Sequence, residues 1–386
     1  MPTLRAHPTK ILASLVLLTG AMTTLGVARA AGGVSRPAAA TFTASVFASG
    51  AHLVHKTPKG KEAISQPDDI TSLGQDIFVG FQNGFGPQGQ ASTTGNRDST
   101  IVEFNLSGHA IDQWDVIGKC DGVTADAATG RLVATVNEDA HSSLYVIDPK
   151  VGAIPVHYRY NESLPSKGGT DAISFFRGMT LISASAPGTT GVAAPQPIYP
   201  AVYRVVFDAT TRVATVHPLF LDEALATVAN TNSTMHGKRE RLALTDPDSN
   251  EAVPAFAKRF AGDFMLTSQG DKEQIFVHNA GRTHQTLSVL KLSDSVDDTA
   301  WASDSSGAIY TTDNSDDTIY EITGPFSRGE VFVADTPCDA NGAPSTCPGP
   351  GFPANFLGRL NPRTGTISRV HLIGPAVVAQ GIYFRR

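Results

Sequence analysis

The sequence predicts an all-β fold, a six-bladed β-propeller, with a seven-bladed ring as the alternative. Short segments of alternating apolar and polar residues recur along the chain, and turn residues separate them. These segments form units of about four strands that repeat every ~40–50 residues, with longer steps at visible insertions. The 386 residues include Gly 36 and Pro 24 and are only 17% charged, which is typical of a turn-rich β protein.

The first 30 residues match a secretory signal peptide. Basic residues occur between positions 5 and 10, an apolar stretch follows at 11–27, and Ala28-Arg29-Ala30 is a small-x-small cleavage site. We therefore expect residues 1–30 to be removed on export, giving a secreted or periplasmic protein.

The mature chain is expected to be one domain. Residues 31–40 (AGGVSRPAAA) are predicted as a disordered start, and residues 41–386 as a single β-propeller. After residue 30, no stretch has the ~18 continuous apolar residues that a membrane helix needs.

The clearest repeat unit lies between Lys119 and Tyr160. It contains four predicted strands, DGVTAD, RLVATVN, SLYVIDP and IPVHYRY, with turn residues between them. An antiparallel unit this small cannot bury its own apolar face, so it requires neighbours of the same kind.

Comparable units fill the rest of the chain. Their first strands open at Asp68, Asp121, Asp171, Asp248, Asp297 and Gln380. In the fifth unit, we expect AIYTTDNSDD and TIYEITG to follow the opening strand, and FLGRLNPRTGTISRV to form a later hairpin. The stretch LDEALATVA at 221–229 is the one candidate for a short helix or turn.

The chain ends are expected to close the ring. TFTASVFAS near the N-terminus and VVAQGIYF at the C-terminus are both predicted to contain strands. Pairing these ends would remove the exposed edges that an open ring of sheets leaves.

Three cysteines occur in this chain. Cys338 and Cys347 bracket a loop rich in Pro and Gly, and a disulfide between them would order a loop that has little else to hold it. Cys120 is then the odd cysteine, and we expect a small buried residue there rather than a nucleophile.

The aspartates that open the units form the first candidate site. First strands line the channel of a propeller, so equivalent positions on successive blades lie around one circle. Clustered carboxylates repel one another unless protons, N–H donors or a cation neutralise them, and Ca²⁺ prefers such oxygen ligands. The alternative, favoured by general turn chemistry, is that each side chain accepts backbone N–H groups. The candidate metal ligands are Asp68, Asp121, Asn137, Asp171, Asp248 and Asp297.

A second set of polar residues follows the second strand of each unit. These residues would form a polar cup beside two long Gly-rich loops, at 84–98 and 187–200, suited to a small ligand or carbohydrate. The alternative is solvated turns. The candidate ligand-binding residues are Asn83, Glu138, Asp139, Gln269 and Asn314.

The repeated aspartate-opened units resemble the NHL and gluconolactonase-like (senescence-marker) superfamily of propellers, over roughly residues 60–386. The resemblance implies a site at the mouth of the central channel. The gluconolactonase-like enzymes open their first blade with Glu-Gly-Pro, which supplies an acidic metal ligand. Here the place reads Gln66-Pro67-Asp68, which counts against the enzyme.

Function stays open between classes at this point. The first hypothesis is an exported propeller that binds a small molecule, a carbohydrate or a protein at one face. The second is a metal-dependent hydrolase or lyase of the lactone or ester type, and the third is a structural cell-surface module. The net charge is −6, the pI is near 6.0, and the sequence has no basic stripe, so no nucleic-acid partner is expected.

Overall fold

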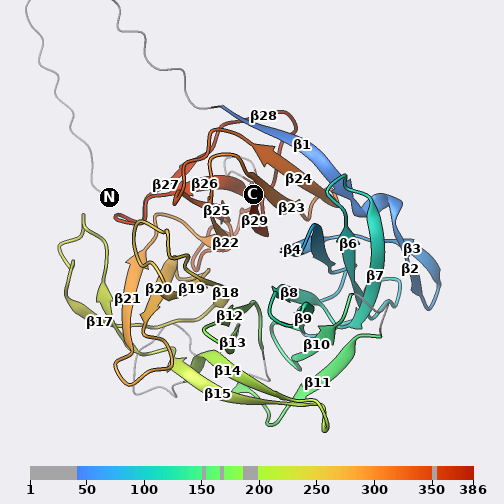
Figure 1. The fold of residues 1–386 in the computed structure, drawn as a ribbon, viewed down its shortest axis with the longest axis horizontal. Helices are drawn as coiled ribbons and strands as arrows, with labels where there is room; N and C mark the ends of the chain where they lie inside the picture. Colours follow the sequence, from blue (N-terminus) through green and yellow to red (C-terminus); the bar gives the residue numbers. More distant parts are fainter. Residues whose placement is uncertain (1–40, 150–153, 166–168, 186–198, 350–353) are drawn as a thin grey trace, which may run out of the picture. The chain divides into compact units, whose positions relative to one another are not determined.

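The described chain is made of β-sheets that run outward from a common centre (Figure 1). The computed structural model describes residues 41–149, 154–165, 169–185, 199–349 and 354–386. The predicted signal peptide (1–30), the predicted disordered start (31–40) and most of the 187–200 loop lie outside the described residues. The prediction of an all-β propeller is confirmed.

The strands group into modules, each a set of paired strands with one strand nearest the centre. The first module is β4 (Pro67–Leu73), β5 (Asp76–Phe81), β6 (Asp98–Phe104) and β7 (Ala110–Ile117). The second is β8 (Cys120–Asp126), β9 (Arg131–Val136), β10 (Ser143–Ile147) and β11 (Val156–Tyr160). The third is β12 (Ile173–Phe176), β13 (Met179–Ser183), β14 (Pro200–Asp208) and β15 (Val213–Leu221). β11 and β15 pair in parallel and join the second and third modules into one eight-stranded sheet.

The fourth module has six strands. From the centre outward they are β18 (Pro247–Ala252), β19 (Phe264–Ser268), β20 (Glu273–His278), β21 (Thr286–Lys291), β16 (Leu225–Val228) and β17 (Arg239–Arg241). The expectation of a short helix or turn at 221–229 is therefore wrong over 225–228. β16 is an extended strand because its backbone pairs with β21.

The fifth module pairs β22 (Val296–Trp301) with β25 (Val331–Asp335), followed outward by β26 (Phe356–Leu360) and β27 (Ile367–Arg369). The last module runs outward from β29 (Ile382–Arg385) through β23 (Ala308–Asp313), β24 (Thr318–Thr323) and β1 (Phe42–Ser49) to β28 (Leu372–Ile373). A short 3₁₀ turn (Gly50–His52) and the hairpin of β2 (Val54–Thr57) and β3 (Gly60–Ala63) follow β1. This grouping favours six modules over seven.

Two expectations about the last modules are corrected. AIYTTDNSDD and TIYEITG supply β23 and β24 of the last module, not the strands beside β22. The N-terminal and C-terminal strands share one sheet but do not pair with each other, because β23 and β24 lie between them. The first error arose because the expectation paired β22 with strands that follow it directly, whereas β22 pairs with β25. The second arose because β29 pairs with β23 rather than with the N-terminal strand.

Apolar cores lie between neighbouring modules and explain why the central strands are buried on both faces. One core joins Phe78, Ile101 and Trp114 of the first module to Val123 and Leu132 of the second. Another joins Phe332 of the fifth module to Phe384 and Phe42 of the last. Burial of each such side chain is worth roughly 1.5–3 kcal/mol relative to exposure. The described part of the chain contains no helix of the length and apolarity needed to cross a bilayer.

Candidate functional site

A cavity of about 680 Å³ lies at the centre of the ring, lined by residues of all six innermost strands. Ala125 N donates to Thr71 Oγ1 (3.3 Å), and Val123 N donates to Asp69 Oδ2 (2.6 Å). Both contacts move two residues forward on β4 and on β8, so these neighbouring inner strands run in the same direction. One end of the cavity is therefore lined by the beginnings of the inner strands (the strand-start end), and the other by their last residues (the strand-finish end).

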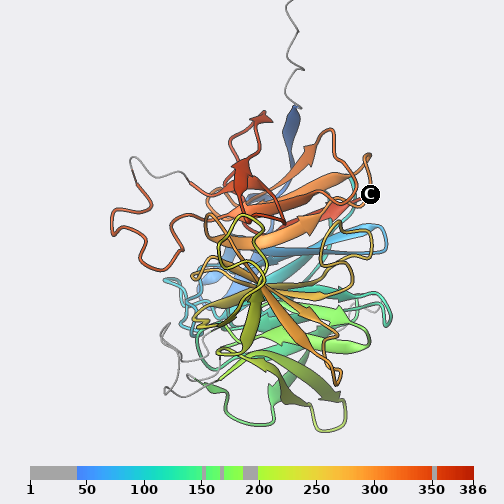
Figure 2. The ribbon, with the colours of Figure 1, turned by 90° about the vertical axis from the view of Figure 1, so that its left-hand side faces the viewer.

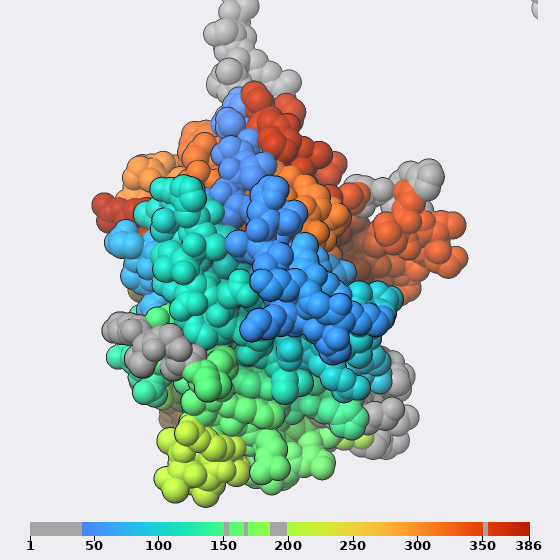
Figure 3. All heavy atoms as spheres, turned by 90° about the vertical axis from the view of Figure 1, so that its right-hand side faces the viewer, coloured from blue at the N-terminus to red at the C-terminus, as the bar shows by residue number. Residues whose placement is uncertain are grey.

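The strand-start end is acidic. Asp68, Asp121, Asp171, Asp248 and Asp297 all line the cavity, as the predicted circle of aspartates requires. Loops that follow second strands add Glu138 and Gln269, and the loop after β25 adds Asp339. Figures 2 and 3 show the 336–349 segment projecting from the side of the ring opposite the C-terminus.

The strand-finish end carries the aromatic side chains of the cavity wall, together with Glu251 near the end of β18. Trp301 at the end of β22 and Phe384 in β29 line it, and Phe175 and Phe256 join them. Asp297 and Trp301 both line the cavity, although a register shift of β22 between Val296 and Thr299 means that simple alternation does not relate them. One channel thus combines a carboxyl-rich half with an aromatic half.

Asp121 belongs to the one cation–carboxylate cluster of the described cavity wall. Lys119 Nζ lies 2.8 Å from Asp121 Oδ1 and also contacts Glu138 Oε1. Gln82 Nε2 donates to Asp121 Oδ1 at 3.0 Å. Burial by itself lowers the pKa of Lys119, but the Asp121 and Glu138 carboxylates outweigh burial and raise it. Lys119 therefore keeps its charge, which its two partners neutralise.

Asp171, Asp248 and Asp297 form a chain of carboxyl groups. Asp248 Oδ2 is buried without a hydrogen-bond partner among the described residues. Burial raises the pKa of Asp248, and the neighbouring Asp171 and Asp297 charges raise it further. The neutral form of Asp248 is therefore favoured more than that of an exposed aspartate.

Asp68 completes the acidic wall on the far side of Lys119. Gln380 Nε2 donates to Asp68 Oδ1 at 2.8 Å. Burial raises the pKa of Asp68, Lys119 lowers it in part, and Asp297 raises it. Its charge is therefore compensated only partly by the protein.

Backbone N–H groups bind one ring aspartate, since Asp121 Oδ2 accepts from Glu138 N (3.3 Å), and they also bind the residues next to two others. Asp69 accepts from Ile70 N (2.7 Å) and from Val123 N (2.6 Å) of the next module. Asp298 accepts from Thr299 N (2.7 Å) and from Ile382 N (2.7 Å) of the last module. Both aspartates of each pair line the cavity, and the second of each pair, Asp69 or Asp298, also ties two modules together through a backbone N–H of the next strand.

Three buried polar atoms of the cavity wall, Asp248 Oδ2, Asn250 Oδ1 and Ser174 Oγ, have no partner among the described residues. Asn250 is 4% exposed; its Nδ2 donates to Ala172 O (2.6 Å) and Ser183 Oγ (2.7 Å), but its Oδ1 meets no donor. Ser174 is 7% exposed and its Oγ has no partner. Unsatisfied buried polar atoms are rare in folded proteins, so a cavity that contains them is equipped for a ligand or for water.

Only part of the second set of predicted residues, the candidate ligand-binding residues, lines the cavity. Glu138 and Gln269 line the cavity, whereas Asn83, Asn137, Asp139 and Asn314 are not part of its described wall. Asn83 and Asn137 have positive φ (54° and 68°) and bond backbone groups, Ser65 N and Lys119 N, through Oδ1. Turn geometry therefore uses these asparagines, and Asn137 is removed from the candidate ligands of a metal.

The expected calcium site is not supported by the donor set. Across the described ranges, no three His, Cys, Asp or Glu side chains are placed to hold one metal ion. The aspartates are distributed around the wall, and Lys119 and Gln380 already bind two of them, Asp121 and Asp68. The residues present do not fit a calcium ion in this arrangement, and we derive no step through one.

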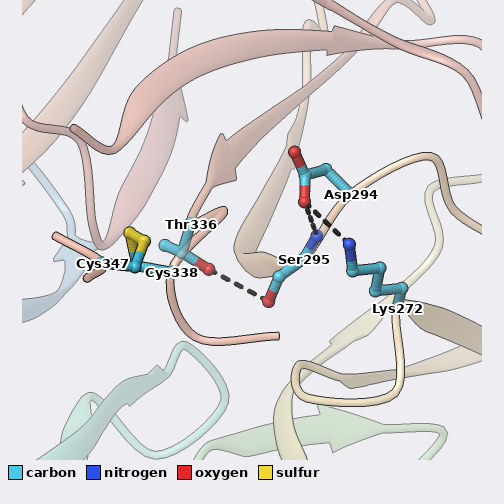
Figure 4. Close-up of a disulfide and its surroundings, with 6 residues drawn as sticks. All are labelled: Lys272, Asp294, Ser295, Thr336, Cys338 and Cys347. Atoms are coloured by element: carbon cyan, nitrogen blue, oxygen red, sulfur yellow. Dashed lines mark hydrogen bonds and ion pairs between the residues drawn. A yellow bond between two sulfur atoms is a disulfide. The ribbon is translucent and has the colours of Figure 1, made fainter. Parts of the chain in front are cut away.

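The predicted disulfide between Cys338 and Cys347 is confirmed, with a Cα–Cα distance of 5.4 Å (Figure 4). Its loop is anchored to the ring by Thr336 Oγ1, which donates to Ser295 Oγ (3.3 Å), and by Asn341 N, which donates to Gly270 O (2.8 Å). Beside it, Lys272 Nζ and Asp294 Oδ1 form an ion pair at 3.2 Å. The bridge thus holds the loop that brings Asp339 to the cavity. Cys120 is buried, and burial raises the pKa of its thiol, as expected for a packed rather than a reactive cysteine.

Several wall residues were missed from the sequence, although alternation could have found them. Asn250 and Ser174 lie two and three residues after an opening aspartate, and Lys119 lies two residues before Asp121. A face-by-face reading of the opening strands selects Asn250 and Lys119. The absence of a donor for Asn250 Oδ1 depends on other strands and has no signal in the sequence.

No protein-family model matches the chain, and a comparison with curated proteins finds no match. Among solved structures, a Bacteroides caccae protein of unknown function is 9% identical, with TM-score 0.44, and the match covers 84% of this chain and 90% of that one. A periplasmic gluconolactonase of Pseudomonas aeruginosa is 11% identical, with TM-score 0.44 and coverage of 85% and 91%. A luciferin-regenerating enzyme is 13% identical, with TM-score 0.37 and coverage of 69% and 80%. Similarities at this level carry no argument about activity or ligand.

Proposed function

We propose that this chain is an exported propeller that binds a small molecule in its central cavity. The observation that carries the proposal is a pair of unsatisfied buried atoms, Asn250 Oδ1 and Ser174 Oγ, in the wall of a cavity of about 680 Å³. That volume falls in the range of small-molecule sites, which is roughly 300–1,000 Å³. Export is supported by the pattern of residues 1–30 and by the disulfide, since disulfides form in oxidising compartments.

The test is a thermal-shift screen of the mature protein against neutral, cationic, anionic and carbohydrate compounds. A ligand that binds the folded state stabilises it by about 2.7 kcal/mol at 100 times its Kd. Ser174→Leu places an apolar side chain at the unsatisfied hydroxyl and should abolish the shift. Ser107→Leu, at an exposed turn, is the matched control. Hits that stabilise the wild type and Ser174→Leu equally would show that binding lies elsewhere.

The carboxyl chain favours a second candidate, a hydrolase or lyase acting on lactones or esters. Burial and the Asp171 and Asp297 charges raise the pKa of Asp248, and a carboxyl with a raised pKa beside other carboxyls is typical of general acid–base catalysis. Lactone and ester hydrolysis by the wild type should fall by about 10²-fold or more in Asp248→Asn. A rate that is unchanged in this variant excludes the role.

A further inference from the structure

We infer that the cavity ligand is an organic cation, an amine joined to an apolar or aromatic group. Its ammonium would lie among the ring aspartates and its apolar part toward Trp301. This inference rests on the proposed function and names the chemical class of the ligand.

The side-chain N–H donors at the strand-start end already meet protein acceptors. Lys119 Nζ contacts Asp121 at 2.8 Å and also Glu138. Gln380 Nε2 donates to Asp68 (2.8 Å), and Gln269 Nε2 donates to Thr336 Oγ1 (3.3 Å). Among the described residues, this end of the cavity therefore offers a ligand few N–H donors.

The acceptors of the same wall are not used up. Asn250 is 96% buried, both contacts of its amide are made by Nδ2, and Oδ1 is left without a donor. Asp248 Oδ2 is buried and has no donor among the described side chains and backbone except a neighbouring carboxyl. A site with unfilled acceptors and occupied donors complements a ligand that donates hydrogen bonds, which an ammonium group does three times over.

Charge favours the same class of ligand. Besides the five ring aspartates, the cavity is lined by Asp69, Asp298 and Glu251 on inner strands and by Glu138 and Asp339 on loops, against the single Lys119. Asp246, just outside the wall, adds to the charge near Asp248. Burial raises the pKa of Asp68, Asp121, Asp171, Asp248 and Asp297, which disfavours uncompensated charge on the ring. A bound cation would supply that compensation.

The aromatic residues at the strand-finish end indicate the chemistry of the rest of the ligand. Asp297 lies at the bulge near the start of β22, and Trp301 is the last residue of the same strand. Phe175, Phe256 and Phe384 surround the same end. A compact inorganic cation would leave this half unfilled, whereas an amine carrying a hydrocarbon chain and a ring would reach from the aspartates to Trp301.

The experiment compares 6-phenylhexylamine with 6-phenylhexan-1-ol, which share length and apolar group and differ in charge. The chain contains two tryptophans, and Trp114→Phe leaves Trp301 as the one fluorescent reporter, in the cavity wall. Trp301→Phe, which keeps the reporter outside the cavity, is the signal control. The amine should bind roughly tenfold or more tightly than the alcohol, because hydrogen bonds to charged groups are the stronger ones.

Calorimetry of the wild type in two buffers of different ionisation enthalpy measures proton exchange. The amine should release about one proton near pH 7, and the alcohol none, because the cation displaces a carboxyl proton. Asp248→Asn should weaken amine binding by roughly tenfold and leave alcohol binding unchanged. Asp112→Asn, which removes an exposed carboxylate of β7, is the matched charge control and should have no effect.

The outcomes separate this inference from the proposed function. The amine and the alcohol could bind with equal affinity and without proton release, and Ser174→Leu could abolish the binding of both. This result would overturn the inference of a cationic ligand but would support a ligand-binding cavity. Failure of the amine up to its solubility limit while a neutral library compound binds the cavity would also overturn it. Amine binding that survives Ser174→Leu would place the amine outside the cavity and would overturn the inference.

Discussion

Neighbouring aspartates of this chain have different hydrogen-bond partners although they are chemically identical. At Asp68-Asp69 and Asp297-Asp298, both members of each pair line the cavity, and each pair lies where the register of its strand shifts at a β-bulge. The first of each pair is left with carboxyl or amide partners, and the second accepts two backbone N–H groups. Position on the strand, not residue type, decides between a candidate ligand group and a structural tie.

Asp298→Ala should destabilise the protein by about 2 kcal/mol, since it leaves Thr299 N and Ile382 N without their acceptor. Asp298→Asn keeps one acceptor oxygen, so its free energy of unfolding should lie between those of the wild type and Asp298→Ala. Urea unfolding measures the difference, with the surface variant Asp112→Ala as control. Equal stability of Asp298→Ala and this control would show that the tie between modules contributes nothing.

The last module shows how an element can depend on both chain ends. β29 is its innermost strand and pairs with β23, whereas β1 pairs with β24 on the outside. Phe384 of β29 packs against Phe326 with ring centroids 5.1 Å apart. Gln380 and Ile382 bond Asp68 and Asp298 of neighbouring modules. The C-terminal segment is thus a shared contact of three modules rather than a free end.

Deletion of residues 380–386 should therefore destabilise the whole ring. Loss of the Phe384 side chain alone is worth about 3–5 kcal/mol, and the backbone pairing with β23 is lost as well. Deletion of Arg386, whose contact is an exposed ion pair with Asp304 at 3.5 Å, is the control and should be nearly neutral. A truncated chain that melts at the wild-type temperature would contradict this account of ring closure.

At the scale of the whole molecule, buried carboxyls link stability to pH. Burial raises the pKa of Asp298 and of Asp335 to about 7, that of Asp246 to about 6, and those of the five ring aspartates in the same direction. An acid whose folded pKa lies above its unfolded value binds its proton more tightly when folded. Its contribution to stability is complete below the unfolded pKa near 4 and is lost as the pH rises through the folded pKa.

The melting temperature should consequently rise when the pH is lowered from 8 to 5. Burial lowers the pKa of His157, so this side chain lowers the stability of the folded protein as the pH falls. It is one group, whereas many carboxyls act in the other direction. The Asp208 and Asp304 carboxyls, whose pKa values are lowered by hydrogen bonds, titrate below this window. Differential scanning calorimetry between pH 5 and 8 measures the effect. A melting temperature that is constant or that rises toward pH 8 would refute the prediction.

The sequence by itself determined the all-β propeller, the positions of the opening aspartates and the disulfide. These features are local: alternation, turn residues and the spacing of Cys338 and Cys347 are visible within short windows. Only the tertiary structure decided which strands pair across long separations, such as β22 with β25 and β29 with β23. It also decided which polar atoms are left without partners, such as Asn250 Oδ1. Both depend on contacts between residues far apart in the chain, and no local pattern encodes those contacts.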